Sequence, residues 1–178
     1  MKKWQTIKEN LTHKDRRFKV YDNEVLSPRG KKFNLLKIDI KPGAHLVGLT
    51  SDDKIPLIKQ YRYPASDTFL EIPSGGVDIE KESFKEAAIR EFKEEVGFIP
   101  HDVKFVARYC HSPSLNFPYE IYFSNNLEKS QVALEEEEFG SLVVLLTYDE
   151  CMEKIKSGQI HDSSTIACLI ACREKGFL

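Results

Sequence analysis

Three glutamates in one short segment could bind a divalent cation. Glu91, Glu94 and Glu95 are three and four positions apart, so a helix would bring their side chains to one side. Like charges at this spacing cost an isolated helix about 0.2–0.5 kcal/mol per pair, and a bound cation would relieve the repulsion. Carboxylate oxygens are the ligands that Mg²⁺ prefers. The alternative interpretation is an acidic helix face that is simply solvated.

Helical periodicity supports the placement of these glutamates on a helix. The residues from 82 to 96 are good helix formers, and Gly97 predicts the end of the helix. Apolar positions recur with the helical period at Phe84, Ala88, Phe92 and Val96. The apolar stripe would pack on a core while Glu91, Glu94 and Glu95 lie along its flank, away from the centre of the core.

The residues around the glutamates follow a fixed spacing. From Gly76, five residues lead to Glu82, and seven more lead to the run Arg90-Glu-Phe-Lys-Glu-Glu-Val-Gly-Phe98. This spacing resembles the Nudix box, whose seven fixed residue types coincide at one starting position with a probability on the order of 10⁻⁹, given a background of about 6% each. The resemblance implies an α+β chain with the Nudix fold, an α/β/α sandwich built on a mixed sheet. It also implies hydrolysis of a nucleoside diphosphate linked to another moiety.

The same resemblance implies roles for individual residues. The metal ligands would be Glu91, Glu94, Glu95 and the carbonyl of Gly75, with Glu94 also counted among the catalytic residues. The cofactor would be Mg²⁺, with Mn²⁺ able to replace it. Arg90 is expected to hold the neighbouring carboxylates by ion pairs, and the two glycines at 75 and 76 to permit a tight loop.

Flanking segments are similar to one branch of the family. Gln60-Tyr61-Arg62, the run from Leu70 to Gly75, and Pro113 fifteen residues after Phe98 resemble the ADP-ribose and nucleoside-diphosphate-sugar pyrophosphatases. The substrate-binding residues would be Arg62, Glu71 and Trp4, with Arg62 gripping a phosphate oxygen and Trp4 stacking on a base. A surface ion pair is the alternative for Arg62.

An acidic run supplies the expected general base. Residues 135 to 138 are all glutamates, and the branch carries its catalytic glutamate in the equivalent loop. Counting back from Gly158 favours Glu137 as the base, with Glu138 next, and the register is ambiguous by one or two residues. A solvated charged loop is the alternative.

Composition limits the other possibilities. Among 178 residues, 26 Lys and Arg nearly balance 28 Asp and Glu, which argues against nucleic acid as a partner. No apolar run approaches the roughly 18 residues of a membrane helix, so we expect a cytoplasmic protein without membrane attachment. The four cysteines are too scattered for a disulfide framework, and Cys168 and Cys172 read as small buried hydrophobic residues.

Patterning along the chain predicts one Nudix domain over residues 1–178, with residues 1–45 forming an N-terminal β extension involved in homodimer formation. The expected strands cover residues 18–21, 33–40, 45–49, 55–61, 68–72, 103–110, 119–124 and 142–146. Besides the glutamate-rich helix, helices are expected at 149–157, capped by Thr147, and from 162 or 163 to 175.

The sequence therefore predicts an Mg²⁺-dependent hydrolase. Its substrate would be a nucleoside diphosphate sugar such as ADP-ribose, and its products a nucleoside monophosphate and a sugar phosphate. The alternatives are a nucleoside triphosphate pyrophosphatase and a non-catalytic module that senses ADP-ribose.

Overall fold

The structure is a computed structural model that describes residues 3–133 and 140–178. Contacts between residues divide the chain into two compact units. Unit 1 comprises Met1–Pro42 and Cys110–Pro118, and unit 2 comprises Gly43–Tyr109 and Tyr119–Leu178.

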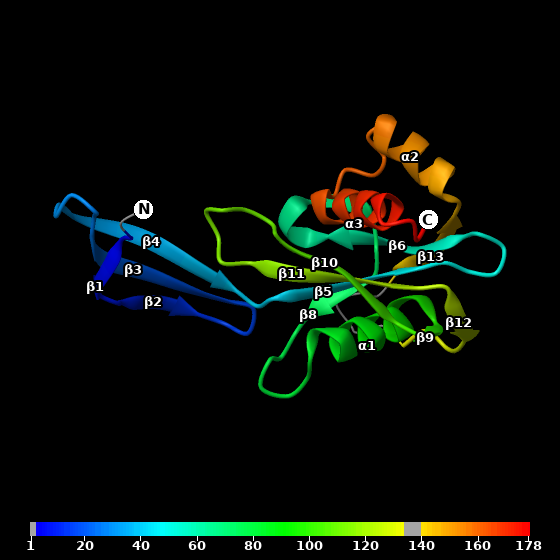
Figure 1. The fold of residues 1–178 in the computed structure, drawn as a ribbon, viewed down its shortest axis with the longest axis horizontal. Helices are drawn as coiled ribbons and strands as arrows, with labels where there is room; N and C mark the ends of the chain where they lie inside the picture. The colour runs from blue at the N-terminus through cyan, green and yellow to red at the C-terminus, as the bar shows by residue number, and fades with distance from the viewer. Residues whose placement is uncertain (1–2, 134–139) are drawn as a thin grey trace. The chain divides into compact units, whose positions relative to one another are not determined.

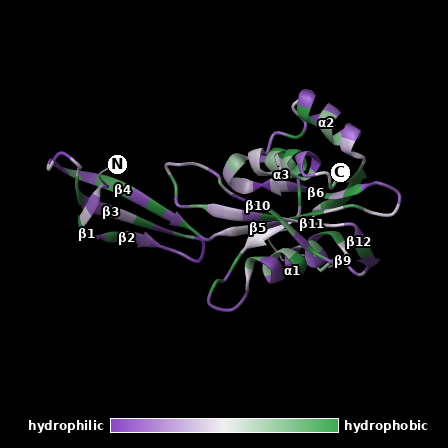
Figure 2. Cartoon of the chain, viewed as in Figure 1, coloured by the Kyte–Doolittle hydropathy of each residue, from purple (hydrophilic) through white to green (hydrophobic). Residues whose placement is uncertain are grey.

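Unit 1 is built on an antiparallel β-sheet. Its strands are β1 (Gln5–Lys8), β2 (Leu11–Lys14), β3 (Phe18–Leu26) and β4 (Lys32–Ile40). Strand β3 pairs with all three others, and it pairs with β4 over its whole length, from Phe18 opposite Ile40 to Leu26 opposite Lys32. Figure 2 shows hydrophilic and hydrophobic residues mixed along β4. Large apolar side chains remain exposed in this unit, among them Trp4 before β1 and Leu35 and Leu36 of β4.

Unit 2 contains a mixed sheet with the strand order β10-β11-β5-β8. These strands are β5 (Gly43–Gly48), β8 (Ser74–Gly76), β10 (Lys104–Cys110) and β11 (Pro118–Ser124). The pair β11–β5 is parallel and the pair β5–β8 is antiparallel. This sheet places the short strand β8 at an edge.

A second sheet of unit 2 is antiparallel, with the order β13-β6-β7. Its strands are β6 (Ile55–Arg62), β7 (Asp67–Glu71) and β13 (Leu142–Leu146), and a short 3₁₀ turn, η1 (Tyr63–Ala65), joins β6 to β7. The strands β9 (Phe98–His101) and β12 (Asn126–Lys129) form a separate pair.

Among its described residues, unit 2 also contains three α-helices, namely α1 (Phe84–Val96), α2 (Tyr148–Lys156) and α3 (Ser163–Glu174). Figure 1 shows α1 on one side of the strands and α2 and α3 on the other. Ser83 and Glu86 form a capping box at the start of α1, and Thr147 and Glu150 form another at α2. Gly97 ends α1 in the left-handed conformation.

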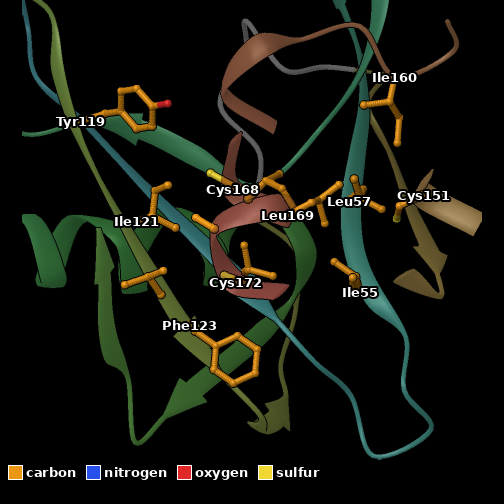
Figure 3. Packing of buried hydrophobic residues seen from close by; sticks show 14 residues of the cluster. Ile55, Leu57, Tyr119, Ile121, Phe123, Cys151, Ile160, Cys168, Leu169 and Cys172 are labelled. Carbon is orange, nitrogen blue, oxygen red and sulfur yellow. The ribbon is translucent and has the colours of Figure 1, made fainter. Parts of the chain in front are cut away.

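Two hydrophobic clusters lie in unit 2, and they correspond to the two sides of its strands. One contains Ala88, Phe92 and Val96 of α1, packed with residues such as Leu46 of β5. The other holds the buried face of α3, and Figure 3 shows Cys168, Leu169 and Cys172 among the side chains of β6 and β11. The expectation that Cys168 and Cys172 are buried hydrophobic residues is confirmed.

The expected helices and the eight expected strands are present, with bounds that differ by a few residues at most, except that β3 continues from Tyr21 to Leu26. Five short strands were missed: β1, β2, β8, β9 and β12. None exceeds four residues, so periodicity had too few positions to reveal them. The division into one domain with a β extension over residues 1–45 stays a prediction.

Candidate active site

The contact between Gly75 and Glu91 joins strand β8 to helix α1. A Cβ atom at position 75 would overlap the Glu91 carboxylate, closer than real Cβ atoms come to their neighbours. Gly75 does not have a positive φ, so its backbone conformation does not require glycine. The sequence argument assigned this glycine to a tight loop; the structure shows that the missing side chain makes room for a carboxylate.

Glu95 is buried, contrary to the expectation that it lies outside the core. Only 2% of the residue is exposed, and its Oε2 accepts the backbone N–H of Ser74 at 2.9 Å. Position 95 follows Phe92 by three residues and precedes Val96, so it falls on the packed side of α1. The N–H of Ser74 supplies the hydrogen bond that a buried carboxylate needs.

Arg90 links three glutamates. Its NH1 group lies 2.8 Å from Glu91 Oε1 and 3.2 Å from Glu94 Oε2, so the expected ion pairs are present. Its Nε and NH2 groups also donate to the two oxygens of Glu82, at 3.2 and 2.9 Å. These hydrogen bonds, together with Glu91, raise the pKa of Arg90 above its already high value. Glu82 therefore anchors Arg90 from the start of the helix.

The donor set at this junction suits a hard divalent cation. Glu91, Glu94, Glu95 and the carbonyl of Gly75 offer only oxygen atoms, as Mg²⁺ prefers. Within residues 3–133 and 140–178, no three Asp, Glu, His or Cys side chains converge as a group that could hold a metal ion. The carboxylates are instead engaged by Arg90 and by the amide of Ser74.

A second ion pair lies on the neighbouring sheet. Arg62 at the end of β6 donates from Nε and NH2 to Glu71 Oε2 of β7, at 2.9 and 2.8 Å. The Glu71 side chain is 14% exposed, and burial raises its pKa despite the opposing charge of Arg62. The Arg62 side chain keeps 34% of its surface exposed. An ion pair, the alternative interpretation for Arg62, is thus part of the structure, although its acceptor is well buried.

The geometry of α1 and β8 agrees with comparisons to known proteins. A NUDIX domain matches residues 39–166. The chain belongs to the NUDIX family. It is 32% identical over 168 residues to the methanol dehydrogenase activator of Bacillus methanolicus, covering 91% of this chain and 88% of that protein. It is 30% identical over 154 residues to the ADP-ribose pyrophosphatase of Bacillus subtilis (strain 168), covering 82% and 80% of the two chains.

The Nudix fold is confirmed by a solved structure. The crystal structure of an ADP compounds hydrolase superimposes with a TM-score of 0.86, covering 100% of this chain and 98% of that chain at 22% identity. The chain is a Nudix hydrolase, and the predicted resemblance to the ADP-ribose pyrophosphatase branch is confirmed by the Bacillus subtilis relative.

The remaining predicted site residues of this Nudix hydrolase are Trp4, Glu137 and Glu138. Trp4 belongs to unit 1, where it is 52% exposed and packs edge-on against Phe33 at 5.6 Å between ring centroids. Glu137 and Glu138 fall outside the described residues. The roles of Trp4, Arg62 and Glu71 in substrate binding, and of Glu137 and Glu138 in catalysis, stay predictions.

Two features of the site were not predicted from the sequence. Ser74 supplies the amide that binds Glu95, and Glu82 binds Arg90 through both carboxylate oxygens. The contact between Glu82 and Arg90 could have been predicted, since these residues are eight positions apart around the start of a helix.

Among the described residues, no helix is long and apolar enough to cross a membrane.

Proposed function

We propose that this Nudix hydrolase cleaves the diphosphate bond of a nucleoside diphosphate sugar, such as ADP-ribose, to a nucleoside monophosphate and a sugar phosphate. The observation that carries the proposal is the contact of two carboxylates with strand β8, since Glu91 lies against Gly75 and the buried Glu95 accepts the N–H of Ser74. The similarity to the Bacillus subtilis ADP-ribose pyrophosphatase supports the substrate class.

The cofactor in this proposal is Mg²⁺, with Mn²⁺ able to replace it. Glu91, Glu94, Glu95 and the Gly75 carbonyl would hold the cation, and Arg90 would keep two of these carboxylates in place. When bound, the cation supplies positive charge that neutralises the diphosphate. Arg62 would hold a phosphate oxygen, oriented by its ion pair with Glu71, and Trp4 would stack on the base.

The general base in this proposal is Glu137, with Glu138 as the neighbouring candidate. The base takes a proton from the attacking water, and the leaving phosphate departs with the P–O bond electrons. Glu137→Gln should lower kcat by roughly 10²–10⁴-fold, with little change in KM. Glu138→Gln, measured in parallel, tests the register. If glutamine variants at all of positions 135–138 match the parent, the acidic run contains no base.

A panel of substrates tests the function itself. ADP-ribose, other nucleoside diphosphate sugars and nucleoside triphosphates are incubated with the purified protein, and products are separated by chromatography. The proposal expects a nucleoside monophosphate and a sugar phosphate from the first two groups. Pyrophosphate released from triphosphates would favour a triphosphate pyrophosphatase, and tight binding of ADP-ribose without turnover would favour a sensing module.

A second function is favoured by one observation, the similarity to the methanol dehydrogenase activator of Bacillus methanolicus over 91% of this chain. Activation of a dehydrogenase would be measured as the rate of methanol dehydrogenase with and without this protein. A Glu95→Gln variant in the same assay shows whether activation needs the hydrolase site. Equal dehydrogenase rates with and without the parent protein would exclude this function for the dehydrogenase tested.

We also propose that two copies associate through unit 1. Unit 1 contains 12 Lys and Arg against 5 Asp and Glu, a net charge of +7, whereas unit 2 contains 14 against 23, a net charge of −9. Opposite charges favour pairing of unit 1 of one copy with unit 2 of another. Exposed apolar side chains in unit 1, including Trp4 and Leu36, would be covered in such a dimer.

A further inference from the structure

Helix α3 is bonded to the segment that carries Gly75. The backbone N–H of Ile72 donates to Thr165 Oγ1 at 3.0 Å, across 93 positions of sequence. Ile72 is 1% exposed and Thr165 is 0% exposed, so water cannot replace this hydrogen bond. The segment from Ile72 to Gly75 is therefore tied to α3, although the Nudix box itself contains no residue of α3.

Hydrogen bonds to Asp162 hold the start of α3. Asp162 caps the helix, and its Oδ2 accepts the N–H of Thr165 at 2.7 Å and the hydroxyl of Ser164 at 2.5 Å. Burial alone would raise the pKa of Asp162, but hydrogen bonds from Ser164 and Thr165 hold it below its usual value. A charged cap fixes the backbone of Thr165, and the hydroxyl of Thr165 extends that constraint to Ile72.

The same segment is held from the opposite side by α1 and β5. Glu95 of α1 accepts the N–H of Ser74 at 2.9 Å, and the carbonyl of Pro73 accepts the N–H of Leu46 at 3.2 Å. Gly75 pairs with Ala44 in the β5–β8 ladder. The backbone from Ile72 to Gly75 is thus clamped between α3 on one side and α1 with β5 on the other.

We propose that Thr165 is a positioning residue for the cation site. It sets the path of the backbone from Ile72 to Gly75, and through this path the position of the Gly75 carbonyl and of the Ser74 amide that orients Glu95. The inference rests on the proposed function, in which Gly75 and Glu95 hold the cation. Partners that orient metal ligands typically change metal affinity by about 10–100-fold when removed.

The experiment measures Mn²⁺ binding to the whole protein without substrate, by electron paramagnetic resonance of free Mn²⁺. Thr165→Val keeps the volume of the side chain but leaves the Ile72 N–H without an acceptor. Its Kd for Mn²⁺ should rise about tenfold or more. Thr165→Ser restores a hydroxyl, and its Kd should stay within about threefold of the parent. Asp162→Asn, which retains a capping side chain, should give an intermediate rise and keeps the test valid if Thr165→Val does not fold.

Ser124→Ala is the matched control, because it removes another buried hydroxyl that does not contact the segment. Ser124 donates to the carbonyl of His101 at 2.5 Å and is 1% exposed. This variant should lose thermal stability and keep the Mn²⁺ affinity of the parent. If Thr165→Val behaves like Ser124→Ala, Thr165 only stabilises the fold and the inference is wrong. If the parent itself binds no Mn²⁺, the proposed function fails instead.

Discussion

Units 1 and 2 differ in how they bury apolar side chains and in the sign of their net charge. Unit 2 holds two clusters of buried apolar residues on either side of its strands and carries an excess of acidic residues, although side chains such as Tyr63, Ile79 and Leu142 are exposed. Unit 1 exposes Trp4, Leu35 and Leu36 on a sheet that carries an excess of basic residues. The difference teaches that unit 2 has apolar clusters of its own to support the proposed cation site, whereas the exposed sheet of unit 1 is the surface that we propose a second copy covers.

The two units also hold their predicted site residues differently. In unit 2, Glu91 lies against Gly75 of β8, Glu95 accepts the N–H of Ser74 of β8, and Arg90 pairs with Glu91 on α1. In unit 1, Trp4 precedes a short exposed strand and contacts Phe33 by its ring edge. We therefore expect changes in unit 2 to affect catalysis directly, and changes in unit 1, apart from the proposed stacking of Trp4 on the base, to affect association.

The largest expected effect tests whether the chemistry resides in unit 2. Glu95→Gln keeps an oxygen that can accept the Ser74 N–H but removes the charge, so activity should fall by about 10²–10³-fold or more while the fold is retained. Glu94→Gln should also abolish turnover. Activity is assayed at saturating Mg²⁺ with circular dichroism alongside, and Glu153→Gln on exposed α2 serves as the control. Activity within about threefold of the parent would remove Glu95 from the ligand set.

Alanine substitution of one glycine in each unit contrasts an effect on activity with an effect on stability. Gly75→Ala in unit 2 pushes the flexible end of Glu91 away, so we expect about a 100-fold loss of activity with little change in Tm. Gly30→Ala in unit 1 meets no neighbouring atom but strains a turn with φ near 79°, which should cost about 1 kcal/mol of stability and no activity. A fully active Gly75→Ala variant would show that the position of Glu91 does not matter.

Charge-reversal variants test whether the opposite net charges of the two units contribute to the proposed dimer. Lys14→Glu with Lys19→Glu in unit 1 should weaken a dimer by about tenfold, since each surface charge contributes up to about 1 kcal/mol. Lys85→Glu with Lys129→Glu makes the same change in unit 2, where added acidity should strengthen the dimer or leave it unchanged. Sedimentation at low and high salt measures both variants. A parent protein that is monomeric and fully active would contradict the dimer proposal.

The Nudix helix and its ends were predictable because they depend on local signals. Periodicity placed Phe92 and Val96 inside, and Gly97 marked the end of α1. The burial of Glu95 was not predictable in this way, because it depends on the N–H of Ser74 arriving from an edge strand of three residues. Long-range partners such as Thr165, 93 residues from Ile72, leave no periodic trace in the sequence.

The role of Gly75 shows the same limit. A glycine before a helix is explained locally by a turn, and that explanation was sufficient for the sequence. The structure replaces it with a tertiary cause, since the space at Gly75 is occupied by a carboxylate from sixteen residues further along the chain. The metal-binding roles of Gly75 and Glu91 stay predictions, but the contact between these two residues depends on the packing of α1 on β8, which the sequence did not reveal.

The smallest expected effect concerns pH and compares one partly buried carboxylate from each unit. Hydrogen bonds lower the pKa of Asp162 in unit 2 despite its burial, and hydrogen bonds from Lys37 and Asn116 do the same for Asp39 in unit 1. A carboxylate with a lowered folded-state pKa stabilises the protein above its unfolded pKa, and this stabilisation is lost as the pH falls through the folded-state pKa.

At pH 7, Asp162→Asn should therefore cost about 1 kcal/mol, a Tm decrease of about 2–4 °C. Below pH 4 its melting curve should approach that of the parent. Asp39→Asn should show the same sign with a smaller change, because Asp39 is more exposed. Calorimetry across pH 3–7 measures both, and a parallel offset of Asp162→Asn at every pH would show that the loss of stability does not come from the charge of Asp162.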